Sequence, residues 1–183
     1  MARTPSTMLA LGTRAPAFRL PDFDGAMHAV EDFDDSPALL VAFICNHCPY
    51  VRAVADRIVR DVRDLRKRGI GVVAVMPNDY VRYPDDTPEQ MKRFAKEHGF
   101  SFAYVVDETQ VVARAYGAVC TPEFFGFNAD LELQYRGRLD ASRTTLVPDA
   151  RRELFEAMCQ IAKTGKGPVE QQASMGCSIK WRE

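Results

Sequence analysis

The chain has 183 residues, of which 46% are hydrophobic and 27% charged, and its formal net charge is −1. This composition is typical of one globular domain with an extension, and it excludes a disordered or collagen-like chain. The balanced charge gives no basic field for nucleic acid, and no apolar stretch approaches the roughly 18 residues of a spanning helix, so we expect neither nucleic acid nor a membrane as a partner.

The first third of the chain alternates short extended segments with turn signals. Ala15–Leu20 and Ala26–Val30 flank the turn dipeptide Asp24-Gly25, which predicts a small N-terminal β-hairpin. Ala38–Ile44 is a continuous apolar run whose length and branched residues predict a strand buried on both faces. Apolar residues at helical spacing follow and predict a long helix that stops at Gly69.

The rest of the chain continues this alternation. Ile70–Met76 predicts a second buried strand, and Thr87 with Gln90 predicts the capping box of a helix that runs to His98. Four further parts are expected in order: a strand at 101–106, a short helix at 109–116, a hairpin of strands 124–128 and 131–135, and a helix at 148–163. This order of buried strands and helices predicts an α/β fold with a mixed sheet.

The informative motif is Cys45-Asn46-His47-Cys48, between the first buried strand and the long helix. Five cysteines are too few for a disulfide scaffold, and without a recognisable secretory leader we expect a cytoplasmic protein, where cysteines are more often reactive or metal-binding. A cysteine at a helix N-terminus faces unpaired N–H groups and the positive dipole end, which lower its pKa. Its partner in the pair can capture the mixed disulfide that the first cysteine forms.

Two other interpretations of the motif stay open. The two cysteines can be small core residues with His47 on the surface, because buried cysteine packs as a small apolar group. They can also belong to a zinc site, although such a site needs about four ligands and the chain has no second cysteine pair with ligand spacing.

With these residues in place, the chain resembles the thioredoxin superfamily, and within it the redoxin and peroxiredoxin-like (AhpC/TSA-like) branch. The resemblance depends on four segments: the hairpin segment Ala15–Leu20, the pair Cys45–Cys48, the loop Val119–Pro122 and the ending Met175–Trp181. It implies a thioredoxin-like fold, with a central mixed β-sheet flanked by helices, an N-terminal β-hairpin and a C-terminal extension. Residues 1–163 would form the domain, and residues 164–183 a tail that packs on it.

The resemblance also implies roles for individual residues. Cys45 would be the exposed nucleophile and Cys48 the buried resolving thiol. Pro122 would be a cis-proline packed against the disulfide, and Thr121 would offer backbone hydrogen bonds to an extended substrate segment by strand addition. Asn46, inside the pair, is the remaining expected substrate-binding residue.

The chain departs from the thioredoxin pattern in the strand before the pair. The buried acid of that strand is missing, since Leu39 and its neighbours are apolar, so proton transfer to Cys48 needs another group. His47 is the nearest candidate for this catalytic role, and protonated His47 would also add positive charge near both sulfurs. Glu123, beside the Thr-Pro loop, is a second candidate, or alternatively an ordinary loop charge.

Two alternative functions are compared with the sequence in the same way. A typical peroxiredoxin has proline seven residues and threonine or serine three residues before its peroxidatic cysteine, whereas these positions before Cys45 and Cys48 hold only alanine, valine and cysteine. Copper-delivery proteins of this fold use two cysteines and a late histidine, and the last histidine here is His98. Neither alternative matches its expected pattern fully, and both stay open.

The other three cysteines lie in different contexts. Cys120 shortly precedes the expected cis-proline and is either a third redox thiol or a small strand-end residue. Cys159 lies on the last helix and is expected in the core. Cys177 lies in the tail, and we hypothesise that the tail packs near the pair, so that Cys177 exchanges with Cys45.

The sequence thus predicts a cytoplasmic thiol–disulfide oxidoreductase that needs no metal or other cofactor. Its expected partners are protein or small-molecule disulfides and a thiol reductant, and we expect a monomer or a homodimer. The alternatives are a peroxiredoxin-like peroxidase that reduces hydroperoxides and a copper-delivery protein.

Overall fold

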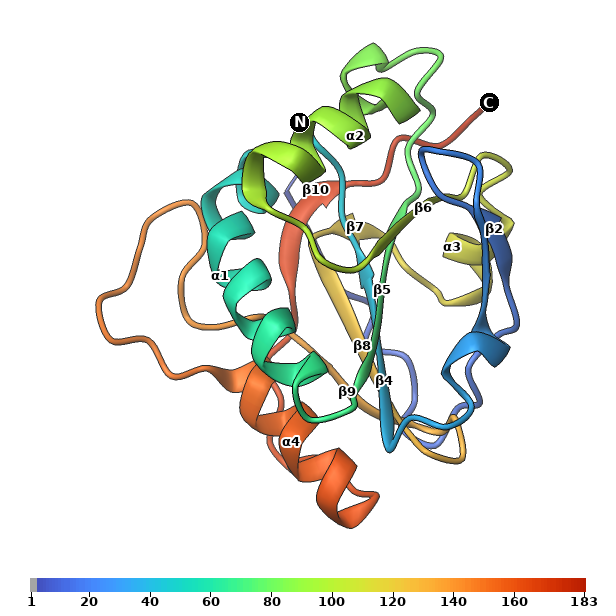
Figure 1. The fold of residues 1–183 in the computed structure, drawn as a ribbon. Coiled ribbons are helices and arrows are strands. Elements are labelled where there is room, and N and C mark those ends of the chain that lie inside the picture. Colours follow the sequence, from blue (N-terminus) through green and yellow to red (C-terminus); the bar gives the residue numbers. More distant parts are fainter. Residues whose placement is uncertain (1–2) are drawn as a thin grey trace.

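A five-stranded mixed sheet with the order β6-β5-β4-β8-β9 forms the centre of the computed structural model, which describes residues 3–183 (Figure 1). The strands are β4 (Ala38–Phe43), β5 (Gly71–Met76), β6 (Ala103–Val106), β8 (Glu123–Asn128) and β9 (Leu133–Gly137). β4 pairs with β5, and β5 with β6, in parallel. β8 pairs antiparallel with β4, and β9 pairs antiparallel with β8. The predicted α/β fold with a mixed sheet is confirmed.

Strand β4 is the middle of this sheet, and all six of its residues are buried. Successive side chains of a strand point to opposite faces, so β4 contributes to two separate cores. Leu40 and Ala42 pack in the core on one face, and Leu39, Val41 and Phe43 pack in the core on the other. Burial on both faces explains why the sequence of this strand is a continuous apolar run.

The helices cover the two faces unequally (Figure 1). α1 (Pro49–Arg66), α2 (Pro88–His98) and α4 (Glu153–Thr164) pack on one face, and α3 (Val111–Ala115) packs on the other. The expected N-terminal hairpin, β2 (Arg19–Pro21) with β3 (Met27–Ala29), lies on the α3 face and is followed by the 3₁₀ turn η1 (Val30–Phe33). None of the helices in residues 3–183 is long and apolar enough to cross a membrane.

Several boundaries differ from the sequence prediction for local reasons. The last helix begins at Glu153 instead of 148, because Asp149 has a φ of 56° that a right-handed helix does not allow. The second hairpin strand begins at Leu133, because Leu131 has a φ of 58° and belongs to the turn. The predicted capping box before α2 is wrong, since the Thr87 hydroxyl donates to the Pro84 carbonyl and accepts no N–H group of the helix.

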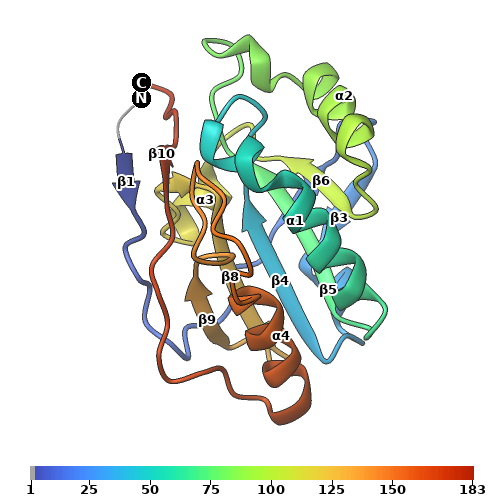
Figure 2. The same ribbon diagram turned by 90° about the vertical axis from the view of Figure 1, so that its left-hand side faces the viewer.

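A second, smaller sheet joins both ends of the described chain to the domain. It has the order β1-β10-β7, from β1 (Arg3–Pro5), β10 (Met175–Ser178) and β7 (Cys120–Thr121), and Figure 2 shows β1 and β10 running side by side. Both pairings are antiparallel. The tail therefore lies directly against the Thr-Pro loop that the sequence associated with the cysteine pair.

Candidate active site

The cysteine pair lies where β4 ends and α1 begins. Ile44 still donates its N–H to Val75 of the neighbouring strand at 3.0 Å, and Cys45 directly follows it. Cys48 is the N-cap residue of α1, and Pro49 takes the first helical position, where its missing N–H leaves no bond unmade. Cys48, not Cys45, thus occupies the end of the 18-residue helix with its partial positive charge.

Both sulfurs are buried, so the expectation that Cys45 is exposed is wrong for this structure. The exposed fraction is 1% for Cys45 and 0% for Cys48. Cys45 Sγ lies 3.3 Å from Thr121 Oγ1, and Cys48 Sγ lies 3.1 Å from the Thr121 carbonyl oxygen, which accepts a hydrogen bond when Cys48 is protonated. The loop before Pro122 therefore closes over the pair.

The surroundings of Cys48 favour its thiolate. A hydrogen bond from the Cys45 thiol lowers the pKa of Cys48 well below its usual range and outweighs burial, which raises it. The thiol of Cys177 and the backbone N–H groups of Val51 and Cys177 also lower this pKa. Within the pair, the pKa of Cys48 is therefore the lower one.

The two thiols next to Cys48 are held in the neutral form. Burial raises the pKa of Cys45 far above its usual range, and the neighbouring Cys48 and Asp86 raise it further. Burial and the contact with Cys48 raise the pKa of Cys177 to about 12. These directions favour a thiolate on Cys48 with neutral thiols on Cys45 and Cys177 beside it.

This distribution predicts a pH titration. The reduced protein should show one thiolate by ultraviolet absorbance at pH values below the ordinary thiol pKa of about 8.5. Because the pKa of Cys48 is lowered, the signal should disappear only on acidification, and Cys48→Ser should remove it at neutral pH. Cys159→Ser, a change at a half-buried thiol of α4, serves as the control and should keep the signal. A signal that survives in Cys48→Ser would place the thiolate elsewhere.

His47 forms an ion pair with a residue that the sequence analysis did not identify. His47 Nδ1 lies 2.7 Å from Oδ2 of Asp86, whose side chain is fully buried at the end of η2 (Pro84–Asp86). The hydrogen bond to Asp86 raises the pKa of His47 against the opposing effect of burial. The His47 ring also stacks on Tyr83 at 5.8 Å with an interplanar angle of 8°. The imidazole is therefore fixed in position and protonated more readily than a free histidine.

Asp86 is itself held by two further donors. The Asn46 N–H donates to Oδ1 at 2.8 Å, and the Asn78 amide donates to Oδ2 at 2.8 Å. The same Asn78 side chain accepts the Lys180 N–H at 2.9 Å, so the tail is connected to the His47–Asp86 pair through one amide. Sequence offered only a weak signal for Asp86, because Asp85 beside it is equally acidic and lies exposed.

The Asn46 side chain does not match its expected role in substrate binding. Asn46 is 4% exposed. Its amide donates to the Asp85 carbonyl at 3.0 Å, and its oxygen accepts the Tyr104 hydroxyl at 3.0 Å. Both ends of the side chain therefore hold the loop of the pair in place.

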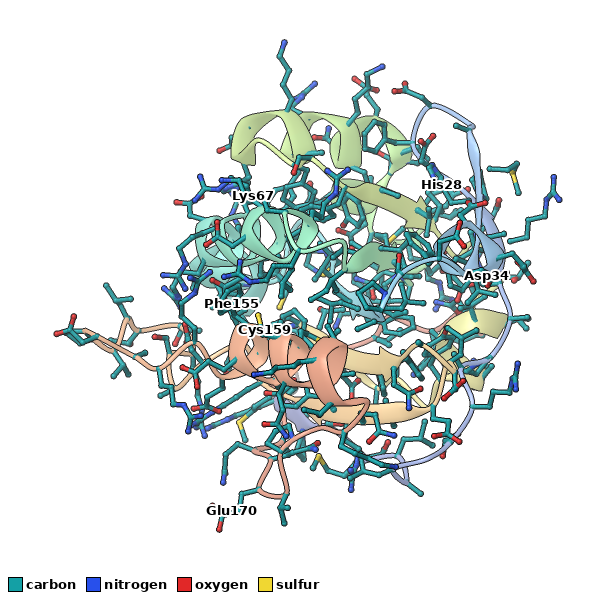
Figure 3. The ribbon with its side chains drawn as sticks, turned by 60° about the horizontal axis from the view of Figure 1, so that its bottom comes forward. His28, Asp34, Lys67, Phe155, Cys159 and Glu170 are labelled. Carbon is teal, nitrogen blue, oxygen red and sulfur yellow. The ribbon has the colours of Figure 1, made fainter. Side chains whose placement is uncertain are left out.

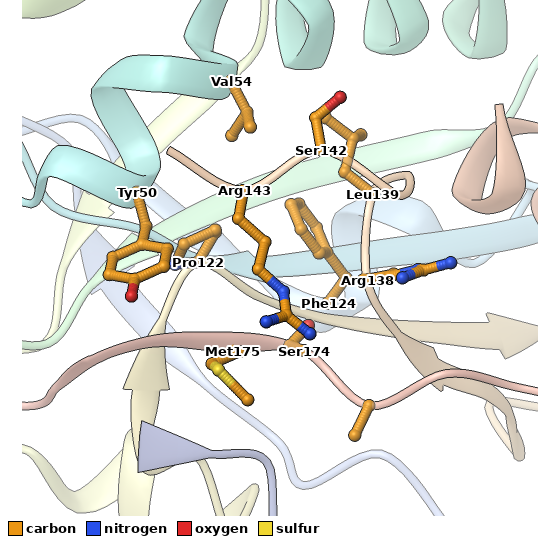
Figure 4. Close-up of a pocket in the computed structure, with 11 residues that line it drawn as sticks. Tyr50, Val54, Pro122, Phe124, Arg138, Leu139, Ser142, Arg143, Ser174 and Met175 are labelled. Carbon is orange, nitrogen blue, oxygen red and sulfur yellow. The ribbon is translucent and has the colours of Figure 1, made fainter. Parts of the chain in front are cut away.

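The Thr121–Pro122 peptide bond is cis, as the resemblance implied. Pro122 lines a small pocket together with Tyr50 of α1 and Met175 of β10 (Figure 4). Arg143 points into this pocket from the loop before α4, beside Met175 (Figure 4). The pocket thus lies between the start of α1 and the Pro122 loop, and neither Cys45 nor Cys48 lines it.

The backbone of Thr121, expected to be open to a substrate, is already paired. Cys177 of β10 lies opposite Thr121, and Ser178 lies opposite Cys120, in an antiparallel ladder. The sequence could not indicate this, because about 55 residues separate the two strands and a two-residue strand leaves no periodic pattern.

Comparison with known proteins supports the resemblance over most of the chain. A family model described as the AhpC/TSA family matches residues 11–154. The chain belongs to the AhpC/TSA family. Among its relatives, peroxiredoxin Bcp of Escherichia coli is 27% identical over 122 residues, which cover 67% of this chain and 73% of that protein. This AhpC/TSA protein is accordingly a redoxin related to peroxiredoxins.

Solved structures agree with this membership. A hypothetical protein from Sinorhizobium meliloti matches with a TM-score of 0.94 and 39% identity over 98% of both chains. A conserved protein from Geobacillus kaustophilus matches with a TM-score of 0.94 and 42% identity over 100% of this chain and 97% of that one. The thioredoxin domain of a thiol–disulfide oxidoreductase from Bacteroides vulgatus has a TM-score of 0.60 and 20% identity over 74% of this chain and 90% of that domain, which shows the thioredoxin-like fold.

The remaining three cysteines of this AhpC/TSA protein lie on different elements. Cys120 is buried in β7, and its sulfur lies 3.8 Å from Oε2 of Glu123. Cys159 is half-buried on α4 beside Phe155, on the helix that packs against α1 (Figure 3). Cys177 is the one of these three whose thiol contacts the pair.

Glu123 is neither exposed nor an ordinary loop charge. It is 1% exposed, and its Oε2 accepts the N–H groups of Val119 at 2.9 Å and Cys120 at 3.3 Å. Burial raises the pKa of Glu123. The carboxyl group therefore holds the loop before Pro122, and its second oxygen has no hydrogen-bond partner among residues 3–183.

Three groups of metal-ligand type come together at the pair. The donor atoms of Cys45, His47 and Asp86 lie within 4.8 Å of one another. Both Asp86 oxygens already accept hydrogen bonds from Asn46 and Asn78, and the ion pair with His47 accounts for the closeness of the other two groups. The cluster therefore functions in this structure as an acid–histidine pair beside a thiol.

Proposed function

We propose that this AhpC/TSA protein is a thiol–disulfide oxidoreductase with Cys45 and Cys48 as its redox pair. The observation that carries the proposal is the Cys48 thiolate, stabilised at the N-terminus of α1 and in hydrogen-bond contact with a neutral Cys45 thiol. A thiolate is the nucleophile in disulfide exchange, and an adjacent thiol can resolve the mixed disulfide.

The reaction runs in two exchanges. The Cys48 thiolate attacks one sulfur of a substrate disulfide, a Cys48–substrate bond forms, and the other substrate sulfur leaves as a thiolate. The Cys45 thiol then attacks Cys48 and releases the second substrate thiol, which takes up the proton that Cys45 loses. The protein ends with a Cys45–Cys48 disulfide, and an external thiol reductant returns two electrons to it.

Two neighbouring groups suit this reaction. His47, whose pKa Asp86 raises, carries a proton close to Cys45 and can supply it to a leaving thiolate. The pocket beside Pro122 is lined by Tyr50, Met175 and Arg143, which would seat the substrate chain next to the reacting disulfide. Arg143 brings a positive charge to the lining of this pocket, which suits an acidic substrate group.

The proposed partners are protein or small-molecule disulfides and a thiol reductant. A Cys45–Cys48 disulfide that an external thiol reduces after each turnover fits a reducing compartment such as the cytoplasm. The reaction as written involves only thiols and disulfides, since every electron passes between sulfur atoms.

A thiol peroxidase is the second candidate, because the buried Cys48 thiolate and the relationship to peroxiredoxin Bcp both favour it. Against it, the position three residues before Cys48 holds Cys45 and not the threonine or serine of a typical peroxiredoxin. A thiol there donates a weaker hydrogen bond than a hydroxyl. We therefore expect slow reaction with hydroperoxides.

The two candidates are separated by measuring both reactions on one preparation. Disulfide reduction is followed with insulin and with oxidised glutathione, and peroxide consumption is followed by stopped flow with hydrogen peroxide. We expect kcat/KM to be at least about tenfold higher for disulfides, a difference of about 1.4 kcal/mol in transition-state free energy. Faster peroxide consumption would overturn the proposal, and a stoichiometric metal in the purified protein would support the copper-delivery alternative.

A further inference from the structure

Strand β10 occupies the edge of β7 that carries the residue before the cis-proline. Cys177 pairs with Thr121 there, and on its other edge β10 pairs with β1, where Arg3 lies opposite Cys177. An extended segment that adds to a sheet edge binds through the backbone groups of that edge. A substrate segment that uses Thr121 must therefore compete with β10.

The close fit of β10 against this edge depends on Gly176. A Cβ atom at Gly176 would collide with the carbonyl group of Thr121, which is backbone and cannot turn aside. Only glycine allows the two strands to approach so closely. The strand is also anchored beyond this point, because the Ile179 N–H donates to the Val119 carbonyl at 3.0 Å. The tail is thus fitted to the Thr-Pro loop along several residues.

This fit places a thiol against the reactive sulfur. Cys177 is 3% exposed, packs in the same core as Cys48, and lowers the pKa of the Cys48 thiol. Burial keeps Cys177 neutral beside the Cys48 thiolate. Cys48 Sγ lies 3.1 Å from the carbonyl oxygen of Thr121, the residue opposite Cys177 in the ladder, so only a local movement separates the two sulfurs from the disulfide bond length of about 2.05 Å.

We propose that β10 is an internal substitute for the substrate strand and that Cys177 is a second resolving thiol, which forms a disulfide with Cys48. The proposal rests on the proposed function, because it needs the mixed disulfide on Cys48. Cys45 and Cys177 then compete for the same sulfur.

The added step balances as follows. Cys177 attacks Cys48 in the mixed disulfide, a Cys48–Cys177 bond forms, and the substrate leaves as a thiol with the proton of Cys177. Cys45 can then attack Cys48, which gives the Cys45–Cys48 disulfide and returns Cys177 to the thiol form. The tail is covalently held in the first oxidised state and released in the second.

The test uses the full-length Cys45→Ser variant treated with one equivalent of oxidised glutathione. Samples are quenched with acid over time and digested with trypsin, which leaves Cys48 in a peptide of residues 20–52 and Cys177 in a peptide of residues 167–180. We expect the glutathione adduct on Cys48 to form first and to be replaced by a crosslink between these two peptides. Adding Cys177→Ser should stop the reaction at the adduct.

The outcomes separate this proposal from the proposed function. An adduct on Cys48 that persists in Cys45→Ser without the crosslink overturns the role of Cys177 and leaves the proposed function standing. Absence of any adduct on Cys48 contradicts the proposed function instead. Cys159→Ser in the same background is the matched control and should not change the crosslink yield.

Gly176→Ala tests the strand independently of the thiols. The added methyl group should displace β10 from Thr121 and lower the crosslink yield at least about tenfold, while the adduct on Cys48 still forms. Ser178→Ala is the control in the same strand and should keep the crosslink. An unchanged crosslink yield in a folded Gly176→Ala protein, checked by circular dichroism, would overturn the proposal that β10 takes the place of a substrate strand. If Gly176→Ala does not fold, the Cys177→Ser comparison decides.

Discussion

Replacing Cys48 by serine is expected to abolish disulfide reduction, with kcat/KM falling by at least about a thousandfold. The reason is that Cys48 carries the thiolate, and serine at the same N-cap position supplies a hydroxyl that stays protonated at neutral pH. Turnover of insulin with dithiothreitol as the reductant measures the loss. Cys159→Ser should keep the wild-type rate.

Cys45→Ser should behave differently from Cys48→Ser. It retains the nucleophile, so a single turnover should still transfer one substrate sulfur to Cys48, although loss of the Cys45 hydrogen bond should raise the pKa of Cys48. Rapid-quench mass spectrometry detects this adduct. If the adduct instead accumulates on Cys45 in the Cys48→Ser protein, then Cys45 is the nucleophile, as the sequence predicted.

Replacing Asp86 by alanine is expected to lower the free energy of unfolding by about 3 to 5 kcal/mol. The carboxylate is fully buried, and its removal leaves His47, the Asn46 N–H and the Asn78 amide without their acceptor. Urea unfolding followed by circular dichroism measures the change. Asp85→Asn, at the exposed neighbour, should change stability by less than about 0.5 kcal/mol.

Asp86→Asn separates the charge of this residue from its hydrogen bonds. The amide oxygen can still accept the Asn46 N–H, but the pKa of His47 should fall because its ion pair is lost. A raised histidine pKa stabilises the fold fully below the unfolded value of about 6.5, and this contribution is lost as the pH rises through the raised value. The stability difference between wild type and Asp86→Asn should therefore be larger at pH 5.5 than at pH 8.5. An equal difference at both pH values would show that the Asp86 charge does not act through His47.

The tail covers the cysteine pair and so affects the rates expected with different substrates. Both sulfurs of the pair are covered in the reduced protein, and Lys180 in the tail connects to Asp86 through the Asn78 amide. Substrate access therefore requires movement of the loop or of β10. A weak rate with a large protein substrate and a faster rate with a small disulfide is the pattern that this covering predicts.

Local patterns in the sequence were sufficient to predict the fold class and to single out the pair Cys45 and Cys48. The apolar run at 38–44 predicted the central strand because burial on both faces requires apolar residues at every position. The pair was recognisable because its spacing and its place before a helix are properties of neighbouring residues. The predicted helix at 148–163 failed at its start, where a single positive φ at Asp149 interrupts an otherwise helical pattern.

The sequence by itself determined which elements form, which two cysteines we propose as the redox pair and which peptide bond lies beside them. Only the tertiary structure separates the pKa values of the two thiols, because these depend on burial and on groups of Cys45, Cys177 and the start of α1 acting at one point. It also decided that Asp86 fixes His47 and that β10 covers Thr121. Apart from those of Cys45 and the start of α1, which are neighbours of Cys48 in the sequence, these contacts join residues about 40 to 130 positions apart, and hydrogen-bond geometry at such separations leaves no period or spacing in the chain.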